Sequence, residues 1–260
     1  MSRRDAVAPL VPMLLAQTRS ELVSRARVPA FSVTSLVLPV VFFTFFGLPV
    51  AGLVRGDGVS IGALLLASFG AYGVGSVMVY AFGIGVAVER GMKVDLLMRA
   101  TPLPSLVALV AKVLTALLFA LGTVTLVLAY GIVVGGVTQP ASVWLALMAW
   151  LLAGSVPFIA LGLAIGYLAG PNAAPAVANL VYLPSAFASG LFVPLEQLPR
   201  FVQAVAPALP TYHHAQLAWS AVGAGGEPTR ASLAWLAGYA ALFGALALHA
   251  YRREARRKLG

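Results

Sequence analysis

The chain has 260 residues, of which 60% are hydrophobic and only 10% are charged. A soluble domain is about 45–50% apolar and about 25% charged, so the composition excludes a water-soluble fold and indicates a membrane protein. The net charge of +9 would suggest nucleic acid as a partner of a soluble protein, but here the basic residues lie at the ends of apolar segments and predict topology instead, so no nucleic-acid partner is expected.

Residues 1–27 are predicted to form an amphipathic helix that lies in the inner membrane interface. Apolar residues recur at helical spacing from Val7 to Leu22, while Glu21 and Arg25 lie off this apolar face. A basic leader attracted to anionic lipid is the alternative. Charges throughout the segment interrupt any apolar core, so we do not expect a cleavable signal peptide.

Six apolar segments are predicted to cross the membrane, because each is close to the roughly 20 residues that a helix needs to span about 30 Å of hydrocarbon. The fifth is marginal in length. The predicted spans are residues 28–54, 59–88, 106–134, 143–168, 174–193 and 233–251. The sequence therefore predicts a single all-α transmembrane domain over residues 1–260.

Lys and Arg residues are distributed unequally around these segments. Only three of the 17, Arg55, Arg200 and Arg230, fall on one side. The others precede the first span, flank the loop between the second and third, or follow the last. Since cytoplasmic loops are enriched in Lys and Arg, the pattern predicts an even number of spans with both termini in the cytoplasm.

The loop at residues 89–105 is predicted to carry a short helix with an apolar edge outside the membrane. Charged and apolar residues interleave along it, and Pro102 and Pro104 end the helix because proline removes a donor and disfavours α geometry before it. An apolar edge in a loop indicates a partner surface. A short interfacial hairpin resting on lipid explains the same composition, so the residues alone leave both open.

Residues 194–227 are apolar but contain four prolines, so no helix inside them is long enough to span the bilayer. Two short helices, about 195–205 and about 212–222, are expected to enter from the outer face and return. His213 and His214 are adjacent and point in different directions on a helix, so we do not expect a metal site.

Nothing in the sequence indicates a catalytic centre. A phosphate-binding loop, a zinc-protease motif and an acidic pair within a span are all missing, and the chain has no cysteine. The spans contain only Lys112, which we expect to snorkel to the interface, and His249. A proton- or sodium-coupled carrier normally shows more buried charge. Phenylalanines near the outer end of the first span fit either an apolar path or an aromatic belt.

The layout of the chain and two of its motifs resemble the membrane subunits of the ABC-2 permease family, bacterial ABC exporters of drugs, antibiotics, lipids and polysaccharides. The resemblance covers nearly the full chain. Residues 88–105, VERGMKVDLLMRATPLPS, are similar to the family's loop between spans two and three, where a coupling helix seats on the ATPase. Residues 182–217 look like the family's fifth span running into its re-entrant extracellular helices, and residues 1–27 look like its connecting helix.

The resemblance implies a multi-pass permease in the bacterial inner membrane that exports an apolar or amphipathic substrate such as a drug, lipid or glycan, with multidrug resistance as one such role. It implies two ATPase subunits that bind ATP and Mg, and a second permease that is the same or a homologous chain. This chain would itself bind no cofactor or metal, carry no catalytic residue and contact membrane lipid. A self-sufficient secondary transporter or channel is the alternative function.

Two sets of residues carry these implied roles. The residues implied to couple to the ATPase are Glu89, Arg90, Met92, Lys93, Leu96, Leu97, Arg99, Thr101 and Pro102. The aromatic residues implied to line the substrate path are Phe43, Phe46, Tyr72, Tyr182 and Phe187. For the second set, packing against helices or lipid is an equally good explanation.

Overall fold

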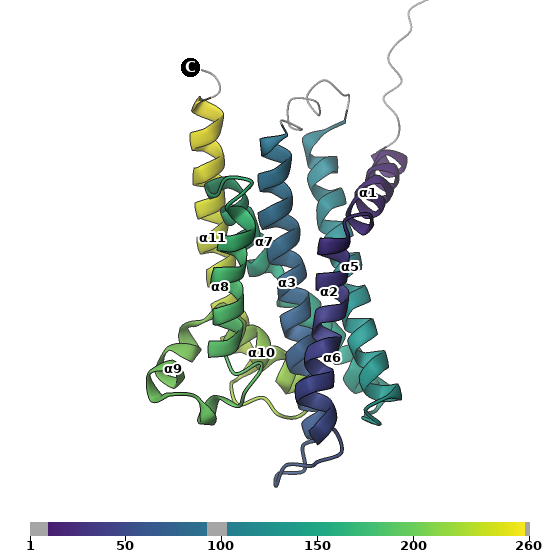
Figure 1. Ribbon diagram of the computed structural model, residues 1–260. Coiled ribbons are helices and arrows are strands. Elements are labelled where there is room, and N and C mark those ends of the chain that lie inside the picture. Colours follow the sequence, from purple (N-terminus) through teal and green to yellow (C-terminus); the bar gives the residue numbers. More distant parts are fainter. Residues whose placement is uncertain (1–9, 93–102, 258–260) are drawn as a thin grey trace, which may run out of the picture.

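The structure is a computed structural model that describes residues 10–92 and 103–257. Within these ranges the chain is helical, apart from turns, loops and one isolated bridge between Val54 and Ser60. Long helices run side by side along one direction (Figure 1). The prediction of an all-α membrane protein is confirmed.

Helices follow one another along the described residues. In chain order they are α1 (Leu10–Ala26), α2 (Pro29–Phe42), η1 (Phe43–Gly47), η2 (Leu48–Val50), α3 (Ile61–Gly91), α5 (Ser105–Val133), α6 (Ala141–Ala153), α7 (Val156–Leu168), α8 (Ala174–Ala188), η3 (Leu195–Gln197), α9 (Arg200–Val205), η4 (Ala206–Ala208), α10 (Pro210–Ala221) and α11 (Thr229–Arg257). The η1 segment is a π-helical turn that continues α2, and the other η segments are 3-10 turns.

Among the described residues, five helical segments are long and apolar enough to cross a membrane. They are Phe31–Val50, Ile61–Gly91, Leu106–Val133, Ala141–Leu168 and Thr229–Glu254. The predicted fifth span, residues 174–193, corresponds to α8, which has 15 residues. At 1.5 Å per residue α8 is about 22 Å long, shorter than the roughly 30 Å hydrocarbon layer, so the structure does not confirm the predicted count of six.

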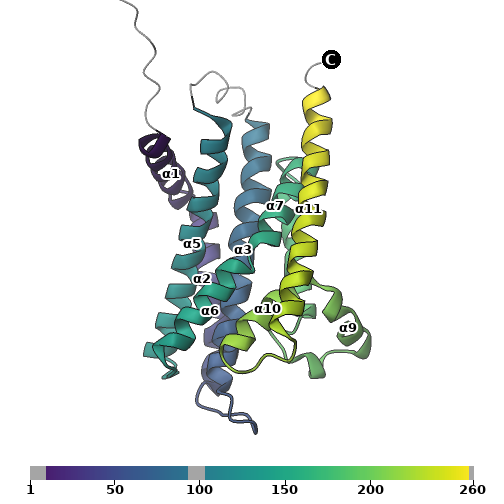
Figure 2. The same cartoon turned by 180° about the vertical axis from the view of Figure 1, so that it is seen from behind.

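Helix α3 lies at the centre of the bundle and contacts α2, α5, α7, α8 and α10. Figures 1 and 2 show it between its neighbours from both sides. Small residues allow the close approach: a Cβ on Gly162 of α7 would lie 2.9 Å from the Cβ of Phe82 and 3.0 Å from the carbonyl oxygen of Met78. Most of α3 is therefore buried, as expected for the core helix of a bundle.

The two ends of the bundle carry different chemistry. The charged end is where α3 ends, α5 begins and α11 ends, at the top of Figure 1, and α1 lies obliquely beside it. The α10 end carries the loop at residues 51–60 and the short helices α9 and α10, which form within the predicted segment 194–227. Helix α10 is inserted against α3, α6 and α11, and its residues Pro210–Ala218 are buried.

Candidate functional site

Helix α1 packs against α5 through a face that includes polar side chains. Glu21, Leu22 and Arg25 are turned toward the bundle, while Leu10 and Leu15 are exposed. The hydroxyl of Thr115 on α5 donates to the backbone carbonyl of Thr18 on α1. A helix forms in the described part of the predicted interfacial segment, but Glu21 and Arg25, expected to lie off the packing face, make its main contacts.

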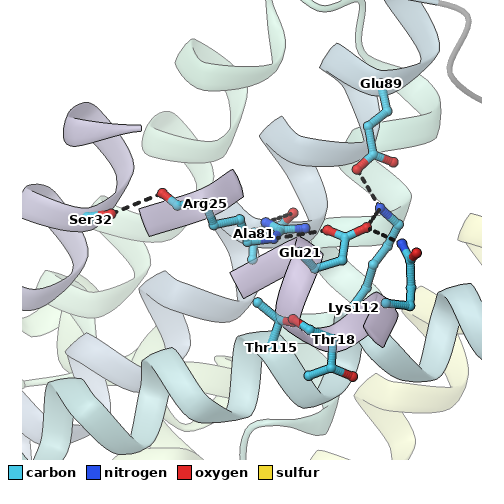
Figure 3. Close-up of polar contacts among 9 residues, drawn as sticks. Thr18, Glu21, Arg25, Ser32, Ala81, Glu89, Lys112 and Thr115 are labelled. Atoms are coloured by element: carbon cyan, nitrogen blue, oxygen red, sulfur yellow. Dashed lines mark hydrogen bonds and ion pairs between the residues drawn. The ribbon is translucent and has the colours of Figure 1, made fainter. Parts of the chain in front are cut away.

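A cluster of charged side chains, the Lys112 cluster, joins α1, α3 and α5 (Figure 3). The Lys112 Nζ donates to Glu21 Oε1 at 3.0 Å and also pairs with Glu89. Gln17 Nε2 donates to the same Glu21 oxygen at 3.3 Å. The Lys112 side chain is only 13% exposed, because the two carboxylates hold its ammonium within the helix packing, and its position relative to the membrane interface stays a prediction.

Arg25 extends the Lys112 cluster toward the middle of α3. Its Nη1 donates to the backbone carbonyl of Ala81 at 3.0 Å, and its Nε lies 3.7 Å from Glu21 Oε2 (Figure 3). The guanidinium lies over the ring of Phe31, 5.9 Å from the centroid. Gly85 makes room for it, since a Cβ there would lie 3.2 Å from Arg25 Nη1. Arg25 therefore fixes α1 to the central helix, while the Glu21–Lys112 pair fixes α1 to α5.

Arg90, the residue after Glu89, reaches the opposite side of α3. Its Nη2 lies 2.6 Å from Glu254 Oε2 on α11, and its Nη1 donates to the backbone carbonyl of Gly166 on α7. The guanidinium also lies 5.5 Å from the ring centroid of Tyr167. Adjacent helical residues point about 100° apart, so Glu89 engages α1 and α5 while Arg90 engages α7 and α11.

The structure places only part of the predicted coupling set. Glu89 and Arg90 are turned into the bundle and pair with Lys112 and Glu254 within the chain, and their role in coupling stays a prediction. Met92 follows them and is 63% exposed. The remaining members, Lys93, Leu96, Leu97, Arg99, Thr101 and Pro102, lie outside the described residues.

The predicted path residues lie in or beside one aromatic cluster between η1, α3 and α8. Phe43, Tyr72 and Tyr182 are buried, whereas Phe46 and Phe187 are partly exposed. Phe192, which the sequence did not single out, joins them. Its ring centroid lies 4.1 Å from that of Phe187, 5.1 Å from Tyr72 and 6.4 Å from Phe46. In this conformation these rings contact one another, and their role in a path stays a prediction.

Helix α8 is bonded to α3 by two tyrosines. The Tyr182 hydroxyl donates to the carbonyl oxygen of Tyr72 at 2.8 Å, and the rings of the two residues stack with centroids 5.7 Å apart. The Tyr80 hydroxyl donates to Asn179 Oδ1 at 2.8 Å. These bonds hold α8 against α3 at two positions.

The two adjacent histidines on α10 serve different neighbours, as their positions predicted. His213 Nε2 lies 2.9 Å from the carbonyl oxygen of Pro207, and its ring stacks on Trp235 of α11. His214 is 1% exposed, and its Nε2 lies 3.0 Å from the carbonyl oxygen of Leu151 on α6. Burial lowers the pKa of His214 to about 4, so its ring is neutral at pH 7. Within residues 10–92 and 103–257, no three metal-binding side chains cluster.

Comparison with known proteins decides the family. The family described as ABC-2 type transporter matches residues 13–220. The chain belongs to the ABC-2 type transporter family. A relative from Bacillus subtilis (strain 168), named "Putative transport permease YvfS", is 28% identical over 242 residues, which is 93% of this chain and 98% of the relative. The chain is therefore a multi-pass membrane permease of an ABC transporter, a class that works with an ATPase partner.

Glu21 and Glu254, which form ion pairs between helices, are not among the site residues predicted from the sequence. Glu21 is the single acidic residue between Leu10 and Ala26, and Glu254 stands alone among arginines after the last span. That isolation was the available signal. A single acidic residue in a basic or apolar segment of a membrane protein usually has a charged partner, and here the partners are Lys112 and Arg90.

Proposed function

We propose that the chain is the permease subunit of an ATP-driven exporter and that the charged end is its coupling end, in the cytoplasm. The proposal rests on two adjacent residues near the end of α3, Glu89 and Arg90, which come shortly before residues 93–102 in the sequence. Glu89 is bonded to α5, and Arg90 is bonded to α7 and α11. The family match and the excess of basic residues at this end support it. Two ATPase subunits, which bind ATP and Mg, and a second permease complete the assembly.

Coupling follows from how the charged end is joined. A displacement of the loop by the ATPase acts first on the end of α3. Glu89 passes it to α1 and α5 through Lys112, and Arg90 passes it to α7 and α11. Packed helices respond to such a displacement as rigid bodies, so the helices tilt together rather than bend one at a time. The permease then alternates between inward- and outward-open states.

The cargo proposed for this path is apolar or amphipathic. Tyr72 and Tyr182 face each other across the α3–α8 contact, so they line a path only when α8 moves away from α3. Phe46 and Phe187 are already partly exposed beside this contact. Aromatic surfaces of this kind accept apolar substrates with little directional demand.

The coupling role is tested by charged substitutions in the loop. Leu96→Asp and Leu97→Asp are expected to abolish co-purification with the ATPase encoded alongside the permease and to remove transport-coupled ATP hydrolysis, because an apolar docking edge does not tolerate a carboxylate. Leu53→Asp is the matched control, since Leu53 is exposed in the loop at the α10 end. Assembly and coupled hydrolysis that survive both loop substitutions would show that the loop is not the coupling element.

The orientation and the need for a partner are tested separately. The chain has no cysteine, so Asp57→Cys and Arg256→Cys each introduce one unambiguous label site, and both positions are exposed. A membrane-impermeant maleimide on intact cells is expected to label position 57 and not position 256; the reverse pattern would invert the topology. Flux through the purified chain alone in liposomes would indicate the self-sufficient carrier instead.

A further inference from the structure

The fourth long helical segment, Ala141–Leu168, is interrupted where α6 passes into α7. Pro157 has no N–H to donate to the preceding turn, and Gly154 and Ser155 form a turn between the helices. The Ser155 N–H bonds to the carbonyl oxygen of Leu152 at 3.2 Å, one residue short of the α-helical partner. The Leu151 carbonyl oxygen therefore lacks its regular helical donor, which would be the Ser155 N–H.

His214 supplies the missing donor from a different part of the chain. Its Nε2 lies 3.0 Å from the Leu151 carbonyl oxygen, and because a carbonyl only accepts, Nε2 carries the proton. In an apolar environment a backbone carbonyl freed by a helix break must be satisfied by a neighbouring group. A side chain of α10 thus completes the hydrogen bonding of α6.

The fit of His214 at the break depends on the residues on both sides. A Cβ on Gly154 would lie 2.6 Å from His214 Cδ2, so only glycine leaves space for the ring. Phe158, in the first turn of α7, is fully buried with its ring centroid 5.1 Å from that of His214. The imidazole is therefore held between the end of α6 and the beginning of α7.

The two sides of the break belong to different packing groups. Helix α6 packs chiefly on α10 and touches α5 and α3 less extensively, whereas α7 packs chiefly on α3 and α11. Figure 2 shows the two helices running one after the other obliquely across the bundle, from the side of α5 to that of α11. Helix α10 is itself fixed to α3, where Trp219 Nε1 donates to Ser68 Oγ at 2.8 Å, and to α8, where Thr211 Oγ1 lies 2.7 Å from Ser185 Oγ.

We propose that His214 is a clamp on the α6–α7 break: its bond to Leu151 sets the angle between the two helices, and a shift of α10 releases that angle. The break is the point where α7 can tilt with α3 and α11 while α6 keeps its place, as hinge residues permit in other proteins. The proposal goes beyond the permease role, since it concerns the geometry of this chain whether or not an ATPase is bound.

The distance between α6 and α7 tests the clamp. Spin labels at Leu145→Cys and Leu168→Cys, both exposed positions, report this distance in the full chain in lipid nanodiscs, with unlabelled chain added to remove intermolecular distances. His214→Phe keeps a ring but loses the donor, and we expect the distance distribution to become at least twice as wide. His214→Gln keeps a donor near the Nε2 position, and we expect the native width. His213→Phe is the matched control and leaves the width unchanged.

A second pair of variants separates the clamp from general packing. Pro157→Ala restores an N–H at the break, so the double variant Pro157→Ala, His214→Phe is expected to recover a narrow distribution. Gly154→Ala displaces the imidazole and broadens it, which tests the same bond if His214→Phe does not fold. A native width in either His214→Phe or Gly154→Ala overturns the proposal, and so does a His214→Gln distribution as broad as that of His214→Phe.

Discussion

The helices are joined at the charged end by long side chains and at the α10 end by short ones. At the charged end, the long side chains of Lys112 and Arg90 reach between helices and contact carboxylates that lie on α1, α3 and α11. At the α10 end, the Thr211 hydroxyl lies 2.5 Å from that of Ser189 and 2.7 Å from that of Ser185.

This difference separates two ways of holding a bundle together. A long charged side chain can keep its partner through a change in helix angle, but the pair fails as a whole when one charge is removed, because the other charge is left inside the protein. A short hydroxyl or a glycine contact fixes one geometry, and the loss of one such contact lowers the free energy of unfolding only modestly. The charged end is thus suited to transmit motion, and the α10 end to define positions.

The largest effect is expected from Lys112→Met. Removing the ammonium leaves the carboxylates of Glu21 and Glu89 close together, with the Glu21 side chain only 14% exposed. Breaking a buried ion pair on one side costs about 3–5 kcal/mol, so the free energy of unfolding should fall by about that amount. Thermal or denaturant unfolding followed by tryptophan fluorescence measures it.

The control for this substitution restores charge or removes it from both sides. Lys112→Arg keeps the positive charge and should cost much less. Adding Glu21→Gln and Glu89→Gln to Lys112→Met removes the unpaired carboxylates and should recover part of the loss. If Lys112→Met lowered the free energy of unfolding no more than Lys112→Arg does, the Lys112 cluster would not stabilise the charged end.

A smaller loss is expected from Gly75→Ala, which tests the tight α3–α8 contact. A Cβ at this position collides with the Tyr182 hydroxyl and would lie 2.8 Å from its ring carbon Cζ. Overpacking of this kind costs about 1–3 kcal/mol. Gly122→Ala is the matched control, because the Cβ there meets only Leu36 Cδ2 at 3.7 Å, and it should stabilise α5 slightly. Equal changes in the free energy of unfolding for Gly75→Ala and Gly122→Ala would contradict the tight α3–α8 contact.

Tyr182→Phe isolates the hydrogen bond from the packing of the ring. The ring remains, but the Tyr72 carbonyl loses the phenol that donates to it at 2.8 Å. The expected loss is about 0.5–1.5 kcal/mol in the free energy of unfolding. Tyr80→Phe removes the comparable bond to Asn179 and is expected to cost a similar amount. A loss of several kcal/mol for Tyr182→Phe would mean that the hydroxyl holds more than this one bond.

Apolar length and composition were sufficient to predict the all-α membrane fold, because lipid as a solvent leaves few alternatives. The predicted boundaries failed where length was marginal: α8 ends at Ala188, and Gly190 then turns the chain with a φ of 81°. The partners of Lys112 were not predictable, since its contacts come from α1 and α3, 91 and 23 residues away in the chain. A spacing rule finds neighbours on one helix and not across helices.

The smallest effect is expected from replacing Asp57, which forms an ion pair with Arg55 as the carboxylates of the charged end do with Lys112 and Arg90. The hydrogen bonds from Arg55 lower the pKa of the Asp57 carboxyl to about 2, but both side chains are about half exposed in the loop at the α10 end. A carboxyl with a lowered pKa stabilises the fold above its unfolded pKa, near 3.8, and loses that contribution as the pH falls toward 2.

Because water and salt screen an exposed pair, Asp57→Asn should leave the unfolding temperature at pH 7 unchanged, and any difference between native and variant should disappear by pH 2. Unfolding scans of both chains at pH 7 and pH 2, at low and high salt, measure this. A loss at pH 7 comparable to that of Lys112→Met would show that exposed and buried ion pairs contribute alike, against the contrast between the two ends.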